Sequence, residues 1–367
     1  MDLFLFIYKG DITLEEFKYL IPEESNDATR MDASLMRTIE GHLRKTFNAH
    51  EYQELLLPTF EYADLLSGFG TNEETMFQFI NHEGKRITLR TDFTVPIARI
   101  YSNAHTDEVR RYSYFGKVYR TQARHKGRSS ELFQGGIELF GLPGCEGDQE
   151  CLSLIEETMQ NIGLSDLKLE LGSAKFYKRL MTLVMDRSLT DILKKKKSSD
   201  MKHLVEAHDF DEDLNKLLLI LPSAFGDIKC LREVKEIVKD DELLEAIEEM
   251  ESLYEFSKHK ENIIFDLCMV PERSYYTGIM MKGFSYYSAH PILQGGRYDH
   301  LFDHFYKNVP SIGFSYHLNN VLDAIGKDRS CRSCVREAGA SRRPRRRYGA
   351  PRSCARRRTT LSTNTSN

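Results

Sequence analysis

Two stretches rich in aromatic and β-branched residues, joined by a polar loop, constrain this chain more than any other feature. They cover residues 111–120 and 133–141, and such a pair predicts an antiparallel hairpin. Because strand side chains alternate between two faces, the second strand has one apolar face and one face carrying Gln134 and Glu138. Such a pattern is more often a hairpin with a solvated outer face. Buried carboxylates need partners, however, and Arg120 supplies a cation, so we interpret this face as the floor of a polar ligand site.

Length and composition narrow the class of protein. A chain of 367 residues has room for about two or three domains. It has no apolar run of membrane-spanning length, and its first residues lack the features of a signal peptide. The seven cysteines show no disulfide framework, and Cys331 and Cys334 lack the second ligand pair of a zinc site. We therefore expect a cytoplasmic protein without a metal, a cofactor or a membrane segment.

Charge is divided sharply along the chain. Residues 328–367 hold twelve arginines, no lysine and two acidic residues, whereas the net charge of the whole chain is −4. The remaining residues are therefore strongly acidic, which argues against broad attraction to nucleic acid. A nucleic-acid-binding arm is one interpretation of the tail, and a shifted reading frame is the other. We favour the second, and expect the tail to be disordered in either case.

Hydrophobic periodicity divides the rest of the chain into three regions. Residues 1–175 mix helix and strand, residues 176–260 have helical spacing throughout, and residues 261–327 return to strands. Within the last region we predict a strand over 275–281 and a turn over 295–299. Helices are also predicted over 32–47 and 148–162, and strands over 52–57, 87–89, 168–171 and 263–269. The pattern favours an α+β fold in which a helical domain interrupts one sheet.

Four segments, at independent spacings, resemble the histidyl-tRNA synthetase-like class II catalytic domain over roughly residues 15–325. The segments are 56–61, 88–92, 111–141, and 275–278 with 295–299. The resemblance implies an antiparallel class II synthetase sheet with flanking helices and an inserted helical domain. It also implies that the first of these segments forms a self-dimer.

The chain departs from this family where a synthetase holds ATP. That task requires fixed cationic donors for the phosphates. The resemblance places Gln122 where the family has a glutamate, Leu132 at the ring that stacks on adenine, and Pro271 at a catalytic arginine. Ser274 replaces an acidic residue. Arg273 lies nearby in sequence as a possible replacement for the lost arginine.

The third family motif has changed as well. Its usual Gly-x-Glu-Arg is replaced by residues that include His317, Asn319 and Asn320, so the arginine expected at the γ-phosphate is missing. With the adenine ring partner and two arginines gone, we expect no adenylation.

The amino-acid half of the site is retained. A carboxylate suits an ammonium group, and acceptors suit imidazole N–H groups. The resemblance implies that L-histidine is held by Asp92, Thr94, Arg120, Gln134, Glu138, Tyr275 and Tyr276.

A histidine site without ATP contacts, followed by no anticodon-reading segment, resembles the regulatory subunits of ATP phosphoribosyltransferase. The resemblance implies a protein without its own catalysis that activates a short-form catalytic subunit. It also implies that histidine is a feedback effector of the first step of histidine biosynthesis, and that self-dimers join a hetero-octamer. The alternatives are a divergent histidyl-tRNA synthetase, an RNA-binding protein that uses the basic tail, and a regulator that binds uncharged tRNA. The acidic body disfavours both nucleic-acid alternatives.

Overall fold

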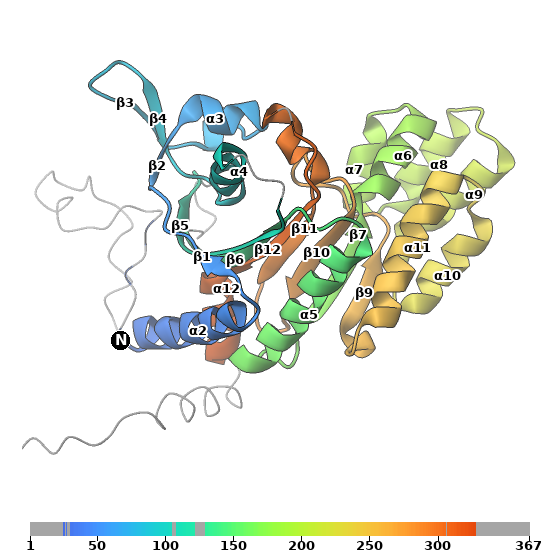
Figure 1. The fold of residues 1–367 in the computed structure, drawn as a ribbon. Coiled ribbons are helices and arrows are strands. Elements are labelled where there is room, and N and C mark those ends of the chain that lie inside the picture. The colour runs from blue at the N-terminus through green and yellow to red at the C-terminus, as the bar shows by residue number, and fades with distance from the viewer. Residues whose placement is uncertain are drawn as a thin grey trace, which may run out of the picture.

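A nine-stranded sheet forms the centre of the molecule in the computed structural model, which describes residues 25, 27, 30–104, 108–121, 129–305 and 307–327 (Figure 1). The order of its strands is β1-β5-β6-β12-β11-β10-β7-β9-β8, and a separate three-stranded sheet has the order β2-β4-β3. The predicted α+β class II synthetase-like fold is confirmed. The arginine-rich tail and the loop residue Gln122 lie outside the described residues.

The helices predicted over 32–47 and 148–162 are present as α2 and α5, whereas the strands predicted over 52–57 and 263–269 are shorter, at Gln53–Glu54 and Ile263–Asp266. The large sheet contains β1 (Gln53–Glu54), β5 (Arg110–Tyr119), β6 (Glu131–Phe140), β7 (Lys168–Ser173), β8 (Phe225–Gly226), β9 (Ile263–Asp266), β10 (Ile279–Phe284), β11 (Leu293–Arg297) and β12 (Ser311–His317). The small sheet contains β2 (Phe60–Tyr62), β3 (Gln78–Ile80) and β4 (Arg86–Leu89). The helices outside the helical block are α2 (Arg30–Ala49), α3 (Ala63–Gly68), α4 (Thr94–Asn103), α5 (Cys145–Ile162), the 3-10 helix η4 (Asp299–Phe305) and α12 (Leu318–Lys327).

Helices cover both faces of the central sheet. In Figure 1, α2, α5 and α12 lie on one face, and α3 and α4 lie on the other. The helical spacing that predicted α2 places Leu35, Ile39, Leu43 and Phe47 on one side of the helix; the last three are fully buried and Leu35 is partly buried. Helix α5 ends at Gly163, whose φ of 77° is the left-handed conformation that glycine adopts readily. None of the helices in the described ranges is long and apolar enough to cross a membrane.

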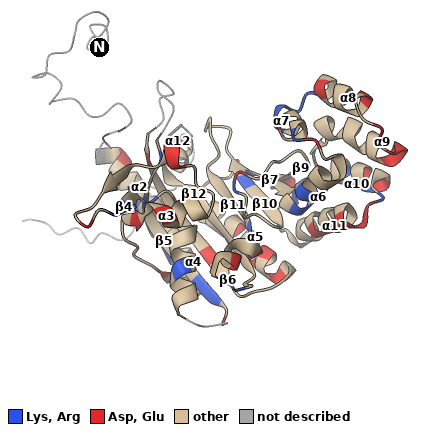
Figure 2. Cartoon of the chain, turned by 90° about the horizontal axis from the view of Figure 1, so that it is seen from above, with Lys and Arg blue, Asp and Glu red and all other residues tan. Residues whose placement is uncertain are grey.

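A block of six helices is inserted between β7 and β9, which pair in parallel. The helices are α6 (Ala174–Val184), α7 (Ser188–Lys195), α8 (Ser198–Glu206), α9 (Glu212–Ile220), α10 (Ile228–Ile237) and α11 (Asp241–Phe256). Figure 2 shows their charged residues spread over the outer surface of the block. Their apolar faces join one core cluster that also contains Leu171 and Phe265 of the sheet. The block therefore shares a hydrophobic core with the sheet.

Two sequence predictions near the end of the sheet are wrong. Only the second half of 275–281 is a strand, and the predicted turn over 295–299 is largely strand β11. Gly295 and Gly296 are an adjacent glycine pair, which locally favours a turn. In the sheet their role is close packing: a Cβ on Gly295 would meet a carbonyl of β12 at 2.4 Å, and one on Gly296 would meet a carbonyl of β10 at 2.5 Å.

Arg297 joins three elements at the end of β11. Its side chain is 9% exposed, and its Nε donates to Asp148 Oδ1 at 2.9 Å. Its Nη1 donates to Asp299 Oδ1 at 3.1 Å and its Nη2 to the Gly144 carbonyl at 2.6 Å. The guanidinium therefore ties the start of α5 and the start of η4 to the sheet.

Asp148 gives the stability of this junction a pH dependence. Burial raises the pKa of Asp148 to about 6, although Arg297 opposes the shift. The folded chain then holds this proton more tightly than the unfolded chain, so this group's contribution to the free energy of unfolding falls as pH rises from about 4 to about 6. We expect the difference in unfolding free energy between wild type and Asp148→Asn to change by about 1 kcal/mol between pH 5 and pH 7. Urea unfolding at both pH values measures it, and parallel pH profiles would contradict it.

Candidate functional site

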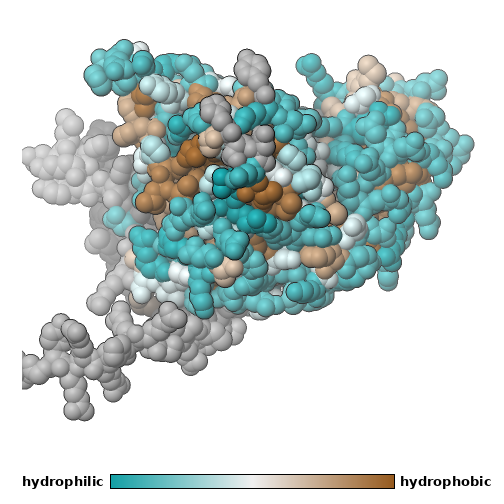
Figure 3. Space-filling model, in the orientation of Figure 1, coloured by the Kyte–Doolittle hydropathy of each residue, from teal (hydrophilic) through white to brown (hydrophobic). Residues whose placement is uncertain are grey.

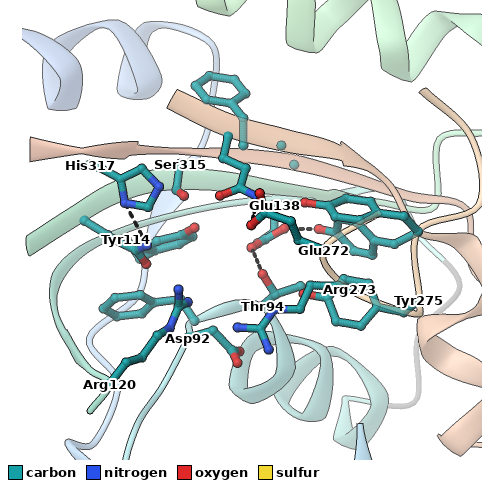
Figure 4. A pocket seen from close by; sticks show the side chains of 18 residues that line it. Asp92, Thr94, Tyr114, Arg120, Glu138, Glu272, Arg273, Tyr275, Ser315 and His317 are labelled. Atoms are coloured by element: carbon teal, nitrogen blue, oxygen red, sulfur yellow. Dashed lines mark hydrogen bonds between the residues drawn. The ribbon is translucent and has the colours of Figure 1, made fainter. Parts of the chain in front are cut away.

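All seven residues predicted to hold a ligand line one pocket on a face of the central sheet (Figure 4). They are Asp92, Thr94, Arg120, Gln134, Glu138, Tyr275 and Tyr276. Strands β5, β6, β11 and β12 contribute to the pocket, and so do the start of α4 and the segment before β10. Its other polar or aromatic side chains include Tyr114, Glu272, Arg273, Gln294, Tyr298, Ser315 and His317.

The strand registers place the pocket residues in rows across the sheet. Gln134 is opposite both Gly116 and His317, and Glu138 is opposite Gly313 four residues further along β6. Gly313 permits the close approach of the carboxyl group, because a Cβ there would meet Glu138 Oε2 at 2.2 Å. The pocket thus has an inner end at Glu138 and an outer end at Gln134 and His317.

Glu138 at the inner end is buried, and each of its oxygens accepts a hydrogen bond from a side chain. Thr94 Oγ1 donates to Glu138 Oε1 at 2.7 Å, and the Tyr298 hydroxyl donates to Oε2. Burial raises the pKa of Glu138 well above its ordinary value, and the nearby Asp92 adds to the shift. A carboxyl group held this way favours a ligand N–H or a cation at the inner end of the pocket, since either would compensate for its burial.

Asp92 is buried and held by its own turn. Its Oδ1 accepts from the Val95 backbone N–H at 3.1 Å, and its Oδ2 accepts from Thr91 Oγ1 at 3.2 Å. The carboxylate therefore has a fixed orientation at the start of α4 while it lines the pocket.

Two guanidinium groups line the same pocket. Arg120 Nε donates to the Thr91 carbonyl at 2.8 Å. Burial lowers the pKa of Arg120, and the neighbouring Arg273 lowers it further. Within the described part of the chain, the Arg273 guanidinium makes no hydrogen bond or ion pair, although the nearby Asp92 and Glu272 help to raise its pKa. Pro271 stands where the family has a catalytic arginine and carries no charge. Two residues further along the chain, Arg273 lines the pocket and supplies a cation there.

The residues at the former third motif contact the protein backbone. Asn319 Oδ1 accepts from the Phe133 N–H at 2.8 Å, and Asn320 Nδ2 donates to the Pro291 carbonyl at 2.7 Å. Leu132, at the expected adenine ring position, packs on the apolar cluster beside the pocket.

His317 lies opposite Gln134 on the neighbouring strand β12, at the outer end of the pocket. Its Nδ1 lies 3.4 Å from Gln134 Nε2. Burial lowers the pKa of His317 to about 4, and the positive charge of Arg120 acts in the same direction. The imidazole is therefore neutral at neutral pH, and accepts the amide N–H of Gln134.

Lys178 of the helical block contacts a segment that lines this pocket. Lys178 on α6 donates from Nζ to the Tyr276 carbonyl at 2.6 Å. Burial lowers the pKa of Lys178. A side chain of the block thus holds the main chain of the segment that lines the pocket.

Sequence reasoning did not assign several lining residues. Tyr114 is six residues before Arg120, so strand alternation places both on the same face. This alternation alone could have assigned Tyr114 to the pocket. Ser315 reaches the pocket because β12 pairs with β6, and Tyr298 reaches it because β11, which it follows, pairs with β12. The first pairing joins distant segments, which local patterns do not reveal.

Comparisons with known proteins identify the family of this chain. Residues 24–321 match the family described as histidyl-tRNA synthetase. The chain is 40% identical over 319 residues to the ATP phosphoribosyltransferase regulatory subunit of Lactococcus lactis subsp. lactis, which covers 85% of this chain and 97% of that protein.

Two solved structures share the fold. One is an ATP phosphoribosyltransferase regulatory subunit/histidyl-tRNA synthetase from Bacillus halodurans C, with a TM-score of 0.77 and 24% identity over 89% of this chain and 91% of that one. The other is histidyl-tRNA synthetase from Nostoc sp. PCC 7120, with a TM-score of 0.68 and 15% identity over 84% and 75%. The chain therefore belongs to the family of ATP phosphoribosyltransferase regulatory subunits, non-catalytic proteins built on the histidyl-tRNA synthetase fold.

Proposed function

We propose that this chain binds L-histidine in the pocket and thereby controls a short-form catalytic subunit of ATP phosphoribosyltransferase in the cytoplasm. The catalytic subunit depends on this chain for activity and loses activity when histidine binds. This coupling provides feedback on the first step of histidine biosynthesis.

The observation that carries the proposal is the difference in charge between the two ends of the pocket: a carboxyl group lies at the inner end and guanidinium groups lie toward the outer end. Asp92 accepts the ligand ammonium, and the guanidinium groups of Arg120 and Arg273 hold its carboxylate. Glu138 receives an imidazole N–H at the inner end. The Arg273 guanidinium supports this assignment, because it lines the pocket beside Arg120 and makes no side-chain hydrogen bond within the described residues, so it remains able to bind a ligand carboxylate.

The former ATP side supports a regulatory role. Asn319 and Asn320 are engaged with backbone groups, and neither carries the charge that phosphate oxygens require. The chain contributes a histidine site to the complex, and this site is either occupied or empty. The chain performs no chemistry of its own.

Control of the partner requires only that histidine bind two states of the complex with different affinities. The Lys178 contact can couple histidine binding to the position of the helical block, because it connects the block to the segment that lines the pocket. Movement of the block then changes the position of the Tyr276 main chain.

Calorimetry with the full chain tests the ligand, and co-expression with a short-form catalytic subunit tests the partner. We expect L-histidine to bind, ATP to leave the heat signal unchanged, and phosphoribosyl transfer to depend on this chain and to fall when histidine is added. Histidine-dependent exchange of pyrophosphate into ATP would instead identify a divergent histidyl-tRNA synthetase.

We further propose that the small sheet forms the self-dimer within the hetero-oligomer. Its outer face exposes Phe60, Tyr62 and Phe79, with Phe60 and Phe79 in edge-to-face contact at 5.5 Å between ring centroids. Leu56, in the preceding loop, is 89% exposed. In Figure 3 hydrophobic side chains gather on the part of the molecule that carries this sheet. Exposed apolar patches of this kind mark protein interfaces, and the family resemblance assigns this segment to a second copy of the chain.

Phe79→Glu is expected to weaken self-association by about tenfold or more, because a twofold interface buries two unpaired carboxylates. Sedimentation equilibrium measures the change. Phe256→Glu on the helical block is the matched control, since Phe79 and Phe256 are both 42% exposed. Equal effects of the two substitutions would contradict the assignment of the dimer face.

A further inference from the structure

We propose that His317 closes the outer end of the pocket, so that the site accepts a free amino acid and rejects ligands extended through the carboxyl group. The inference rests on the proposed histidine site and adds a specificity to it. The rejected class includes aminoacyl adenylates and their stable analogues.

The position of His317 follows from the register of the sheet. It is the last residue of β12, opposite Gln134, and shares a strand face with Gly313 and Ser315. All three line the pocket. Glu138 is opposite Gly313, four residues inward, so Glu138 and His317 mark the two ends of the binding space along the strands.

The ligand carboxylate belongs at the His317 end. Arg120 directly follows β5, whose Gly116 is opposite Gln134, so Arg120 lies beyond that row. The charge of Arg120 acts directly on the His317 imidazole. In Figure 4 both side chains lie on the same side of Glu138. A group attached to a carboxylate held by Arg120 would extend toward the imidazole.

Size and charge both favour exclusion. The imidazole of His317 lines the pocket at the end of the row that contains Gln134, where its Nδ1 lies 3.4 Å from Gln134 Nε2, so the ring occupies this space. The ring is neutral at neutral pH because its pKa is about 4, so it offers no positive charge to a phosphate. It therefore blocks the space without replacing the lost arginine.

The backbone around His317 is held in place. Its N–H donates to the Ile292 carbonyl at 2.8 Å. Asn319 and Asn320, in the next turn, bond to the Phe133 N–H and the Pro291 carbonyl. Since these contacts hold the corner between β12 and α12, the ring closes the pocket without a change of fold.

The test is calorimetric titration of the full chain with L-histidine and with a non-hydrolysable histidyl sulfamoyl adenosine. We expect the wild type to bind the analogue at least about tenfold more weakly than histidine. His317→Gly should reduce the ratio of the two dissociation constants by about tenfold or more. His82→Gly, which removes an exposed histidine from a surface turn, should keep the wild-type ratio.

Two further variants separate filling of space from damage to the fold. His317→Ala should behave as His317→Gly does, and His317→Gln should keep the wild-type ratio because its side chain occupies a similar volume. Circular dichroism confirms that each variant is folded. Wild-type protein that binds the analogue as tightly as histidine would overturn this inference and leave the proposed function standing. Failure of the wild type to bind histidine would overturn both.

Discussion

Replacing Asp92 by asparagine is expected to weaken L-histidine binding by about one to two orders of magnitude. A hydrogen bond to a charged group contributes about 1.5–3 kcal/mol, and this substitution removes the carboxylate that receives the ligand ammonium. Asparagine keeps an oxygen that accepts the Val95 N–H, which Asp92 Oδ1 accepts at 3.1 Å. The start of α4 is therefore preserved, and calorimetry reports the loss of charge.

The control for this variant is Asp323→Asn, which neutralises an exposed carboxylate on α12. It should bind histidine as the wild type does. Wild-type affinity in Asp92→Asn would show that the ammonium group binds elsewhere, and the orientation proposed for the ligand would be wrong.

Arg297→Met is expected to produce the largest loss of stability, about 3–5 kcal/mol in the free energy of unfolding. Removing one partner of a buried ion pair leaves the other charge uncompensated, and here both Asp148 and Asp299 lose their cation. The contact with the Gly144 carbonyl is lost as well. Urea unfolding at pH 7 measures the effect.

Arg86→Met is the matched control, because Arg86 also pairs with two carboxylates, Asp64 and Glu73. That cluster is exposed to water, which screens its charges. The control should therefore lose much less stability than Arg297→Met. Equal losses would show that the buried junction has no special role.

The central hairpin was predictable because its pattern is local. Alternation over 111–120 and 133–141 identified two strands and gave the second one an apolar face, on which Ile137 and Leu139 are fully buried. Its opposite face was correctly expected to combine Gln134 and Glu138 with Arg120. The helices over 32–47 and 148–162 were found for the same reason, since helical spacing repeats within a few turns.

Predictions failed where the neighbours of a segment decide its structure. The Gly295–Gly296 pair favours a turn by itself, but within the sheet it allows close packing between β10 and β12. Arg273 could not be assigned to the pocket from its sequence position, because the segment before β10 is irregular and strand alternation does not apply to it.

The sequence by itself determined which chemical groups the chain offers to a ligand. It also showed that the groups a synthetase needs to hold ATP are missing. These are properties of residue type and of spacing within short segments. Only the tertiary structure decided that Glu138, Tyr298 and Thr94 form one hydrogen-bonded cluster, and that His317 lies across from Gln134. The reason is that β12 pairs with β6 across more than a hundred residues of chain and brings β11 with it, and such pairing depends on how the whole sheet buries its apolar face.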